Sequence, residues 1–204
     1  MSRLIGRWLL MFLLLTMAGW CDDLPAGAKV FIQWQATATP AQVEGTIDMI
    51  KSRLDDLSTY HLDLRGKNQA VLTLGNAANK SGLLARLTRR GVLTIKSLDR
   101  SHFLRLRPQD LVGVRAGLEE DPPTLFVRLS PDADQRLAAL AVDPRLVLCL
   151  DGDQVGTIRK PRRGPQGWGL MGPDLDDGKV AALSLLVSHG PLPLAPQIVK
   201  IIQP

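Results

Sequence analysis

Aromatic residues, cysteines and histidines are scarce in this 204-residue sequence. Phe, Trp and Tyr make up 4% of it, so we expect an aliphatic core and no aromatic platform for stacking nucleic-acid bases. Two cysteines, Cys21 and Cys149, are too few for a disulfide framework. The histidines, at 61, 102 and 189, lie far apart and form no H-x-x-x-H pair, so no metal site is predicted.

Positive charge is in mild excess. The formal net charge is +5, and two basic residues, Arg3 and Arg7, belong to the N-terminal segment. The other basic residues are scattered and do not alternate with aromatic ones, which argues against nucleic acid as a partner. At the end of a predicted helix, Arg86, Arg89 and Arg90 either balance the helix dipole or contact an acidic lipid or protein.

Motifs of common enzymes are also absent from the sequence. It has no G-x-S-x-G elbow and no P-loop, and the glycines at 164, 167 and 169 do not fit G-x-G-x-x-G. Asp151-Gly152-Asp153 lacks the further ligands of an EF-hand, so we interpret it as a hairpin turn. We therefore expect no catalytic residue, no cofactor and no metal, and a protein that is not an enzyme.

Residues 1–28 have the pattern of a signal peptide or membrane anchor. A basic start precedes an apolar run at 8–20, which is shorter than the roughly 20 residues of a membrane-spanning helix. The basic start favours a cytoplasmic N-terminus and an exported body. Cys21 is a candidate lipid attachment site, although Trp20 stands where a lipoprotein signal has a small residue. An uncleaved anchor and cleavage near 26–28 are the alternatives.

Residues 29–99 predict an α+β base subdomain of ferredoxin-like, β-α-β-β-α-β order. The helix that begins at Thr39-Pro40 has one apolar stripe, so Arg53 is expected on its polar side. The predicted elements are a strand at 29–37, a helix at 40–57, strands at 60–64 and 70–74 joined by a tight turn, a helix carrying Leu83, Leu84 and Leu87, and a strand at 92–98.

Residues 100–190 predict a second α+β subdomain, the head, and residues 191–204 predict a return strand to the base. The Asp-Gly pair between two apolar runs is a strong hairpin signal. The predicted elements are a strand at 124–129, a helix from Ser130-Pro131-Asp132, hairpin strands at 145–150 and 154–158, a basic loop at 160–169, a helix from Asp176-Asp177, and the return strand at 198–202.

Several short motifs follow one another in a definite order along the chain. An apolar strand ends in Asp151-Gly152, Gly169-Leu-Met-Gly172 follows, and a helix rich in Ala and Leu leads to Gly190-Pro-Leu192-Pro193. Earlier, a helix at 42–57 carries Arg53, and a strand at 123–129 precedes Ala133 and Leu137. These motifs resemble the first large periplasmic domain of SecD and SecDF, over nearly everything after residue 29. Ser188-His189 departs from the family, which usually has an Arg before this glycine.

The resemblance implies a non-enzymatic periplasmic accessory of Sec-dependent protein export. Its partners would be unfolded or emerging polypeptides and subunits of the Sec translocon. Its N-terminus would attach it to the outer face of the cytoplasmic membrane, with its body in the extracytoplasmic space. Unlike SecD, this sequence contains no bundle of membrane helices that would couple proton movement to export. We expect Arg159, Gln166 and Trp168, on the head, to contact polypeptide. The alternative is a structural or adaptor lipoprotein of an envelope complex unrelated to export.

Overall fold

The computed structural model describes residues 25–55, 57, 59–75, 83–99, 101–143, 145–159 and 161–204. Two compact units divide the chain. The base unit comprises Met1–Thr88, described from residue 25 onward, and Leu194–Pro204, whereas the head unit comprises Arg89–Pro193. Both units combine antiparallel sheets with helices, which confirms the α+β class.

The predicted signal or anchor is almost entirely outside the described part of the chain. Cys21, the candidate lipid attachment site, also lies outside it. Among the helices that the structure does describe, none has the length and apolar character needed to cross a membrane.

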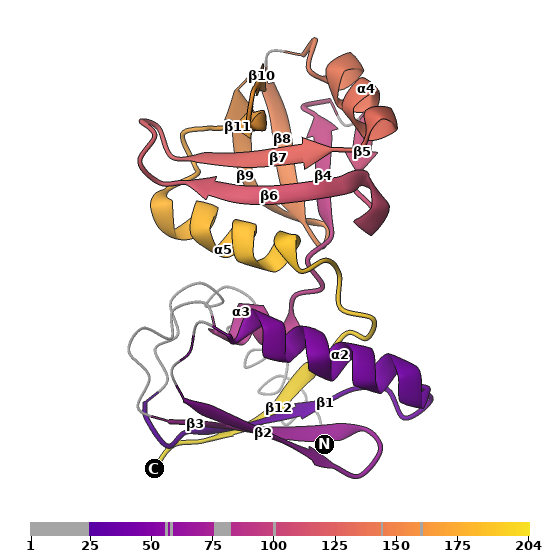
Figure 1. Cartoon of the computed structure of the whole chain (residues 1–204), viewed down its shortest axis with the longest axis vertical. Coiled ribbons are helices and arrows are strands. Elements are labelled where there is room, and N and C mark those ends of the chain that lie inside the picture. Colours follow the sequence, from indigo (N-terminus) through magenta and orange to yellow (C-terminus); the bar gives the residue numbers. More distant parts are fainter. Residues whose placement is uncertain are drawn as a thin grey trace, which may run out of the picture. The chain divides into compact units, whose positions relative to one another are not determined.

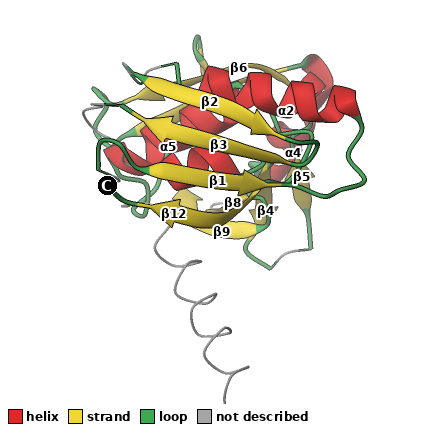
Figure 2. Ribbon diagram, turned by 90° about the horizontal axis from the view of Figure 1, so that it is seen from below, coloured by secondary structure: helices red, strands yellow, loops and turns green. Residues whose placement is uncertain are grey.

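The base unit is one antiparallel sheet with two helices packed on one of its faces (Figures 1 and 2). The strand order is β12-β1-β3-β2, so the C-terminal strand pairs with the first strand of the unit. Val30, Ile32 and Leu72 point into the core and are fully buried. The elements are β1 (Lys29–Gln33), α2 (Pro40–Arg53), β2 (Tyr60–Arg65), β3 (Gln69–Leu74), α3 (Leu83–Thr88) and β12 (Gln197–Ile202).

Helix α2 begins where the sequence predicts. The Thr39 hydroxyl accepts a hydrogen bond from the Gln42 backbone N–H at 3.3 Å, and the Gln42 side chain accepts one from the Thr39 N–H at 3.0 Å. This reciprocal pair is a capping box, and Pro40 occupies the first turn, where its missing N–H has no cost. Local sequence is therefore enough to define this end of the helix.

The expected exposure of Arg53 is wrong, because its side chain is fully buried. Its Nη1 donates to the Arg86 carbonyl at 3.1 Å, near the C-terminal end of α3. Carbonyls in the last turn of a helix have no partner within the helix, so a buried guanidinium can satisfy one of them. Arg53 therefore ties the end of α2 to the end of α3.

The strand predicted at 92–98 does not belong to the base. It forms β4 (Leu93–Ser97), which pairs with β5 (Phe103–Arg105) and β8 (Arg145–Leu150) in the head. The base sheet takes β12 at its edge instead. β4 alternates Leu93 and Ile95 with Thr94 and Lys96, as a strand with one buried face does in either sheet, so its own sequence does not choose between the sheets and only pairing decides.

The head unit contains two four-stranded sheets, with orders β5-β4-β8-β9 and β10-β11-β7-β6. Helix α5 packs against β6 and β7, and α4 lies beside β5 and β7 (Figure 1). The remaining elements are the 3-10 turn η1 (Pro108–Asp110), β6 (Leu111–Gly117), β7 (Thr124–Leu129), α4 (Pro131–Leu140), β9 (Asp153–Arg159), β10 (Arg162–Gly164), β11 (Gly167–Leu170) and α5 (Asp177–Ser188).

The hairpin predicted at Asp151-Gly152 is confirmed. Asp151 and Gly152 have φ angles of 53° and 95°, as a two-residue turn between twisted strands requires. The Asp151 carboxylate accepts the backbone N–H groups of Gly91 and Val92, at 3.2 and 2.8 Å. These bonds offset the cost of a positive φ at a residue other than glycine.

The loop predicted at 160–169 is wrong in part, because it contains β10 and most of β11. The two strands pair from Arg162 opposite Gly169 to Gly164 opposite Gly167, and β11 continues onto β7. Such short, glycine-rich strands have no alternating pattern of their own. Their pairing with a longer strand defines them.

Candidate functional site

The buried position of Trp168 removes it from the expected contact surface. Its side chain is 6% exposed, and its Nε1 donates to the Asp134 carboxylate at 2.8 Å. The other oxygen of Asp134 lies 2.9 Å from the Arg163 guanidinium. Trp168 therefore anchors the β10–β11 hairpin to α4 and is not available to a partner.

Gln166 and Arg159 are exposed, but on different parts of the head. The Gln166 side chain, in the turn between β10 and β11, accepts a hydrogen bond from Arg115 on β6, and that guanidinium lies 5.1 Å from the Phe126 ring centroid. Arg159 ends β9, where its backbone N–H donates to the Met171 carbonyl at 2.9 Å. The structure thus leaves these two side chains at the surface without bringing the three predicted residues together.

Arg159 lines a cleft in the head with a volume of about 720 Å³. Arg162 adds a second guanidinium, and Glu120 and Asp121 contribute carboxylates to the same cleft. The chain is close to β9 here, because a Cβ on Gly172 would lie 1.9 Å from the Thr157 carbonyl oxygen. The cleft has mixed charge, which suits a polar segment better than an apolar one.

A second cleft, of about 430 Å³, runs between β5 and α4. Its walls carry two apolar side chains that face solvent: Phe103 is 68% exposed and Val142 is 79% exposed. Leu104, Ala139 and Leu140 also line it. Single exposed apolar side chains are ordinary, but two on the walls of one groove form a candidate site for apolar side chains of a partner. We call this site the Phe103 groove.

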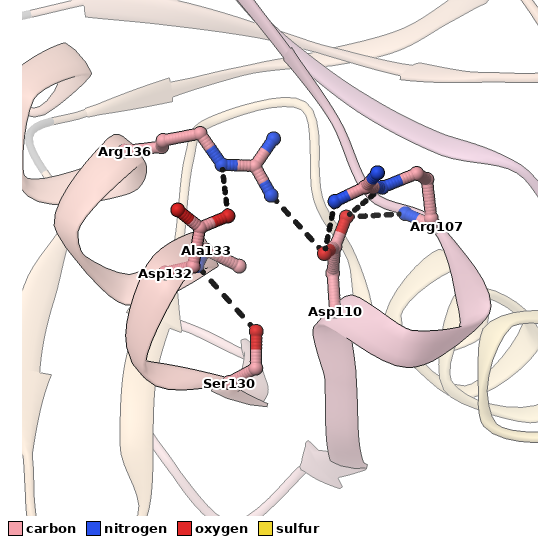
Figure 3. A network of polar contacts seen from close by, with 6 residues as sticks. All are labelled: Arg107, Asp110, Ser130, Asp132, Ala133 and Arg136. Carbon is pink, nitrogen blue, oxygen red and sulfur yellow. Dashed lines mark hydrogen bonds and ion pairs between the residues drawn. The ribbon is translucent and has the colours of Figure 1, made fainter.

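A buried carboxylate, Asp110, binds two arginines, one of which lines the Phe103 groove; Figure 3 shows these contacts. Asp110 is 1% exposed and accepts hydrogen bonds from the Arg107 backbone N–H at 2.9 Å and from the Arg107 guanidinium at 3.1 Å. Arg136, which lines the groove from α4, lies 3.1 Å from Asp110 and 3.1 Å from Asp132. These arginines, Arg107 foremost, lower the pKa of Asp110 to about 2. The network therefore joins η1 to α4 through charge.

A Ser-Asp-His group occurs in the turn at 97–102, but its geometry differs from a catalytic triad. The Ser101 hydroxyl contacts both the Asp99 carboxylate at 2.7 Å and His102 Nδ1 at 2.8 Å, so the serine lies between the other two. In a triad the histidine lies between serine and carboxylate. Hydrogen bonds from Ser97 and Ser101 lower the pKa of Asp99 to about 2. These contacts stabilise a tight turn.

Metal-ligating side chains do not gather in the part of the chain that the structure describes. No group of three or more His, Cys, Asp or Glu side chains there is placed to hold a metal ion. His61 is instead 2.8 Å from Asp63 on an exposed strand of the base, and Cys149 is a buried free thiol. The described features of the head that could contact a partner are its grooves, its exposed apolar side chains and its arginines.

Comparison with known proteins finds likeness in structure alone. No model of a protein family matches the chain, and no curated protein sequence does so. The crystal structure of SecDF in its super-membrane-facing form matches 94% of this chain and 33% of the SecDF chain, with 14% identity and a TM-score of 0.60.

A second solved structure, of a shorter chain, also has a similar fold. It is a structure of SecDF, a membrane component that enhances protein export, and it matches 86% of this chain and 99% of its own, with 13% identity and a TM-score of 0.58. This chain spans about a third of the length of the first SecDF chain, 33%. At these identities the likeness concerns the fold. The chain therefore shares the fold of a SecDF segment, as the resemblance of its motifs predicted.

Proposed function

We propose that this protein is a non-enzymatic accessory of Sec-dependent protein export, which binds polypeptide on the extracytoplasmic side of the membrane. The observation that carries the proposal is the match in fold to SecDF over 94% of the chain. One of the matched proteins is described as a membrane component that enhances protein export. Because one fold can serve several functions, the proposal needs support from the surface of the head.

The Phe103 groove supplies that support. Its exposed Phe103 and Val142 can contact apolar side chains of a chain that has not yet folded, since such chains expose residues that are later buried. The Arg107–Asp110–Arg136 network keeps one wall in position without filling the groove. A groove with apolar walls and charged ends accepts many sequences, as an export accessory must.

The base offers less to an adaptor role. The sheet face opposite the helices is mixed: His61 pairs with Asp63, and the Lys200 ammonium lies 6.0 Å from the Phe31 ring centroid. An adaptor that binds one resident partner is expected to have a larger continuous apolar patch. The adaptor function therefore remains the alternative outcome of the experiment below.

Photocrosslinking in living cells tests the proposal. A photoreactive amino acid is placed at Phe103 or Val142, and Lys67, exposed in the hairpin turn of the base, is the control position. We expect crosslinks from the head positions to chains in transit or to translocon subunits, and few from Lys67. Crosslinks to one resident envelope protein, with none to cargo or translocon, would contradict the export role and favour the adaptor.

A further inference from the structure

One face of the head sheet β5-β4-β8-β9 collects positive charge from all four strands. The pairing register defines this face, since residues opposite each other on neighbouring strands share it. Lys96 pairs with Phe103 on one side and Val147 on the other, and Arg145 pairs with Arg159. The opposite face carries Leu93, Ile95 and Leu148, which are fully buried in the core. The first face is therefore the outer one, which we call the cationic face.

The cations of this face are Lys96, Arg105, Arg145 and Arg159. Arg105, Arg145 and Arg159 are exposed and Lys96 is half-buried. The side chains of these four have no ion pair or hydrogen bond with any residue that the structure describes. The other strand residues on the face are uncharged: Thr94, Phe103, Val147, Cys149, Gln154 and Thr157. Four like charges on one face, none of them in a direct ion pair with a described residue, create a field that attracts anions, although Glu120 and Asp121 share a cleft with Arg159.

Acidic side chains lie at the ends of the face and not within it. Asp151, at the hairpin turn, already accepts two backbone N–H groups. Asp99 and Asp143 line a hollow with Leu98 and Arg145 at the other end. Asp99 is bonded to Ser97 and Ser101, which leaves it ionised at neutral pH. These carboxylates reduce the field at the ends, whereas the strand residues of the face itself include no acidic side chain.

The shape of the cationic face favours a polypeptide over a membrane. A hollow of about 460 Å³ lies on its β4–β5 side, lined by Thr94, Lys96, Phe103 and Arg105 and, toward the hairpin turn, by Arg90 and by Asp151, whose carboxylate is occupied by two backbone N–H groups. A hollow accepts a few side chains of a polypeptide, whereas a flat bilayer surface cannot enter it. Phe103 borders both this hollow and the Phe103 groove, so one bound segment can place an apolar side chain against Phe103 and carboxylates beside Lys96 and Arg105.

We propose that the cationic face binds acidic segments of extended polypeptide, so that the head selects among chains by charge. This inference rests on the proposed function and adds a substrate class to it. The contacts are at the surface and in water, so binding is expected to weaken steeply with salt. Phe103 supplies an apolar contact that salt does not weaken.

Fluorescence anisotropy on the purified full chain tests the proposal. The probes are two labelled twelve-residue peptides that each contain Leu and Phe; one carries five Asp or Glu residues, and the other carries Asn or Gln at the same positions. We expect the acidic peptide to bind about tenfold more tightly at low salt, and this preference to vanish near 0.5 M salt. In the double variant Lys96→Gln/Arg105→Gln, the preference should fall severalfold. The control Lys51→Gln/Lys67→Gln removes the same charge from the base and should leave it unchanged.

The outcomes separate the two proposals. Equal binding of both peptides, unaffected by Lys96→Gln/Arg105→Gln, would overturn charge selection and leave polypeptide binding intact. Binding of neither peptide would overturn both. Binding to vesicles that contain anionic phospholipid, weakened by the same double variant and without acidic peptide binding, would also overturn the proposal, because the face would then be a lipid contact. Thermal unfolding of each variant checks that it is folded.

Discussion

Replacement of Asp110 by Asn tests whether charge holds one end of the Phe103 groove in place. Asn has the same shape but no charge, so it loses the ionic contacts to Arg107 and Arg136. The pKa of Asp110 is about 2 in the folded chain, against an ordinary value of 3.8. A difference of that size corresponds to about 2 kcal/mol of stabilisation of the ionised form. Because the Arg107 side chain is half exposed, solvent screens part of this stabilisation. We therefore expect Asp110→Asn to lower the free energy of unfolding of the head by about 1–2 kcal/mol at pH 7.

The contribution of Asp110 to the stability of the head should decrease as the pH falls. The folded pKa of Asp110 is lowered, so its contribution is complete above pH 3.8 and is lost as the pH falls through about 2. The difference in unfolding free energy between the native chain and Asp110→Asn should therefore be full at pH 7 and small at pH 2. Asp99 titrates in the same range, but it is present in both proteins and its contribution cancels.

Urea unfolding followed by tryptophan fluorescence measures this difference. The chain has four tryptophans, and replacing Trp8, Trp20 and Trp34 by Phe leaves Trp168 to report on the head alone. Both proteins carry this background. An Asp110→Asn variant as stable as its parent at pH 7, or a difference that does not shrink between pH 4 and pH 2, would show that the ionised Asp110 carboxylate does not stabilise the head.

Three further substitutions test other contacts, each by urea unfolding of the full chain. Gly172→Ala should destabilise the head by about 2 kcal/mol or more, because the new Cβ meets the Thr157 carbonyl oxygen at 1.9 Å. Trp168→Phe removes the hydrogen bond from Trp168 to Asp134 and should destabilise the head by about 1 kcal/mol, measured by far-ultraviolet circular dichroism. The fluorescence of Trp34, which reports on the base, should show an unchanged transition for the base. Arg53→Ala should destabilise the base by about 2–4 kcal/mol, because it leaves a cavity and removes the buried hydrogen bond to the Arg86 carbonyl.

Control substitutions accompany the changes at Gly172 and Arg53. Gly66→Ala, at a position where a Cβ meets nothing within 4 Å, separates the clash at Gly172 from the general effect of removing a glycine, although its φ of 69° adds strain of its own. Lys51→Ala, half a turn from Arg53 and exposed, should change stability by less than about 0.5 kcal/mol. Equal effects of Arg53→Ala and Lys51→Ala would contradict the buried role of Arg53.

Local patterns predicted the elements whose ends are defined by their own residues. The capping box at Thr39, the Asp151-Gly152 turn and the strand β7 are where the sequence placed them. Each depends on interactions within a few residues, so position along the chain is sufficient information. The sequence did not predict β5 and β6, because their alternation is interrupted by Arg and Gly, which carry no strand signal.

The predictions for β4, Arg53 and Trp168 were wrong in part, because contacts with residues far away along the chain decide where these residues lie. β4 is a strand as predicted, but its partners are β5 and β8, and the paired residues of β4 and β8 lie between 49 (Ser97 and Leu146) and 57 (Leu93 and Leu150) residues apart along the chain. Arg53 has the charge of a surface residue, and only the arrival of α3 provides the carbonyl that permits its burial. Trp168 was expected at the surface because it lies in a polar, glycine-rich segment, yet Asp134, from a different element, accepts its N–H and allows it to be buried.

The cationic face also depends on pairing between strands that lie far apart in the sequence, so the order of residues along the chain did not predict it. Lys96, Arg105, Arg145 and Arg159 stand on four different strands, so no single stretch of the sequence contains all four. Shifting the register of β8 on β4 by one residue would place Arg145 on the core face and Leu146 in solvent. The burial of Leu146 and Leu148 therefore fixes the pairing that collects the four cations, so the same hydrophobic packing that stabilises the head also assembles its positive field.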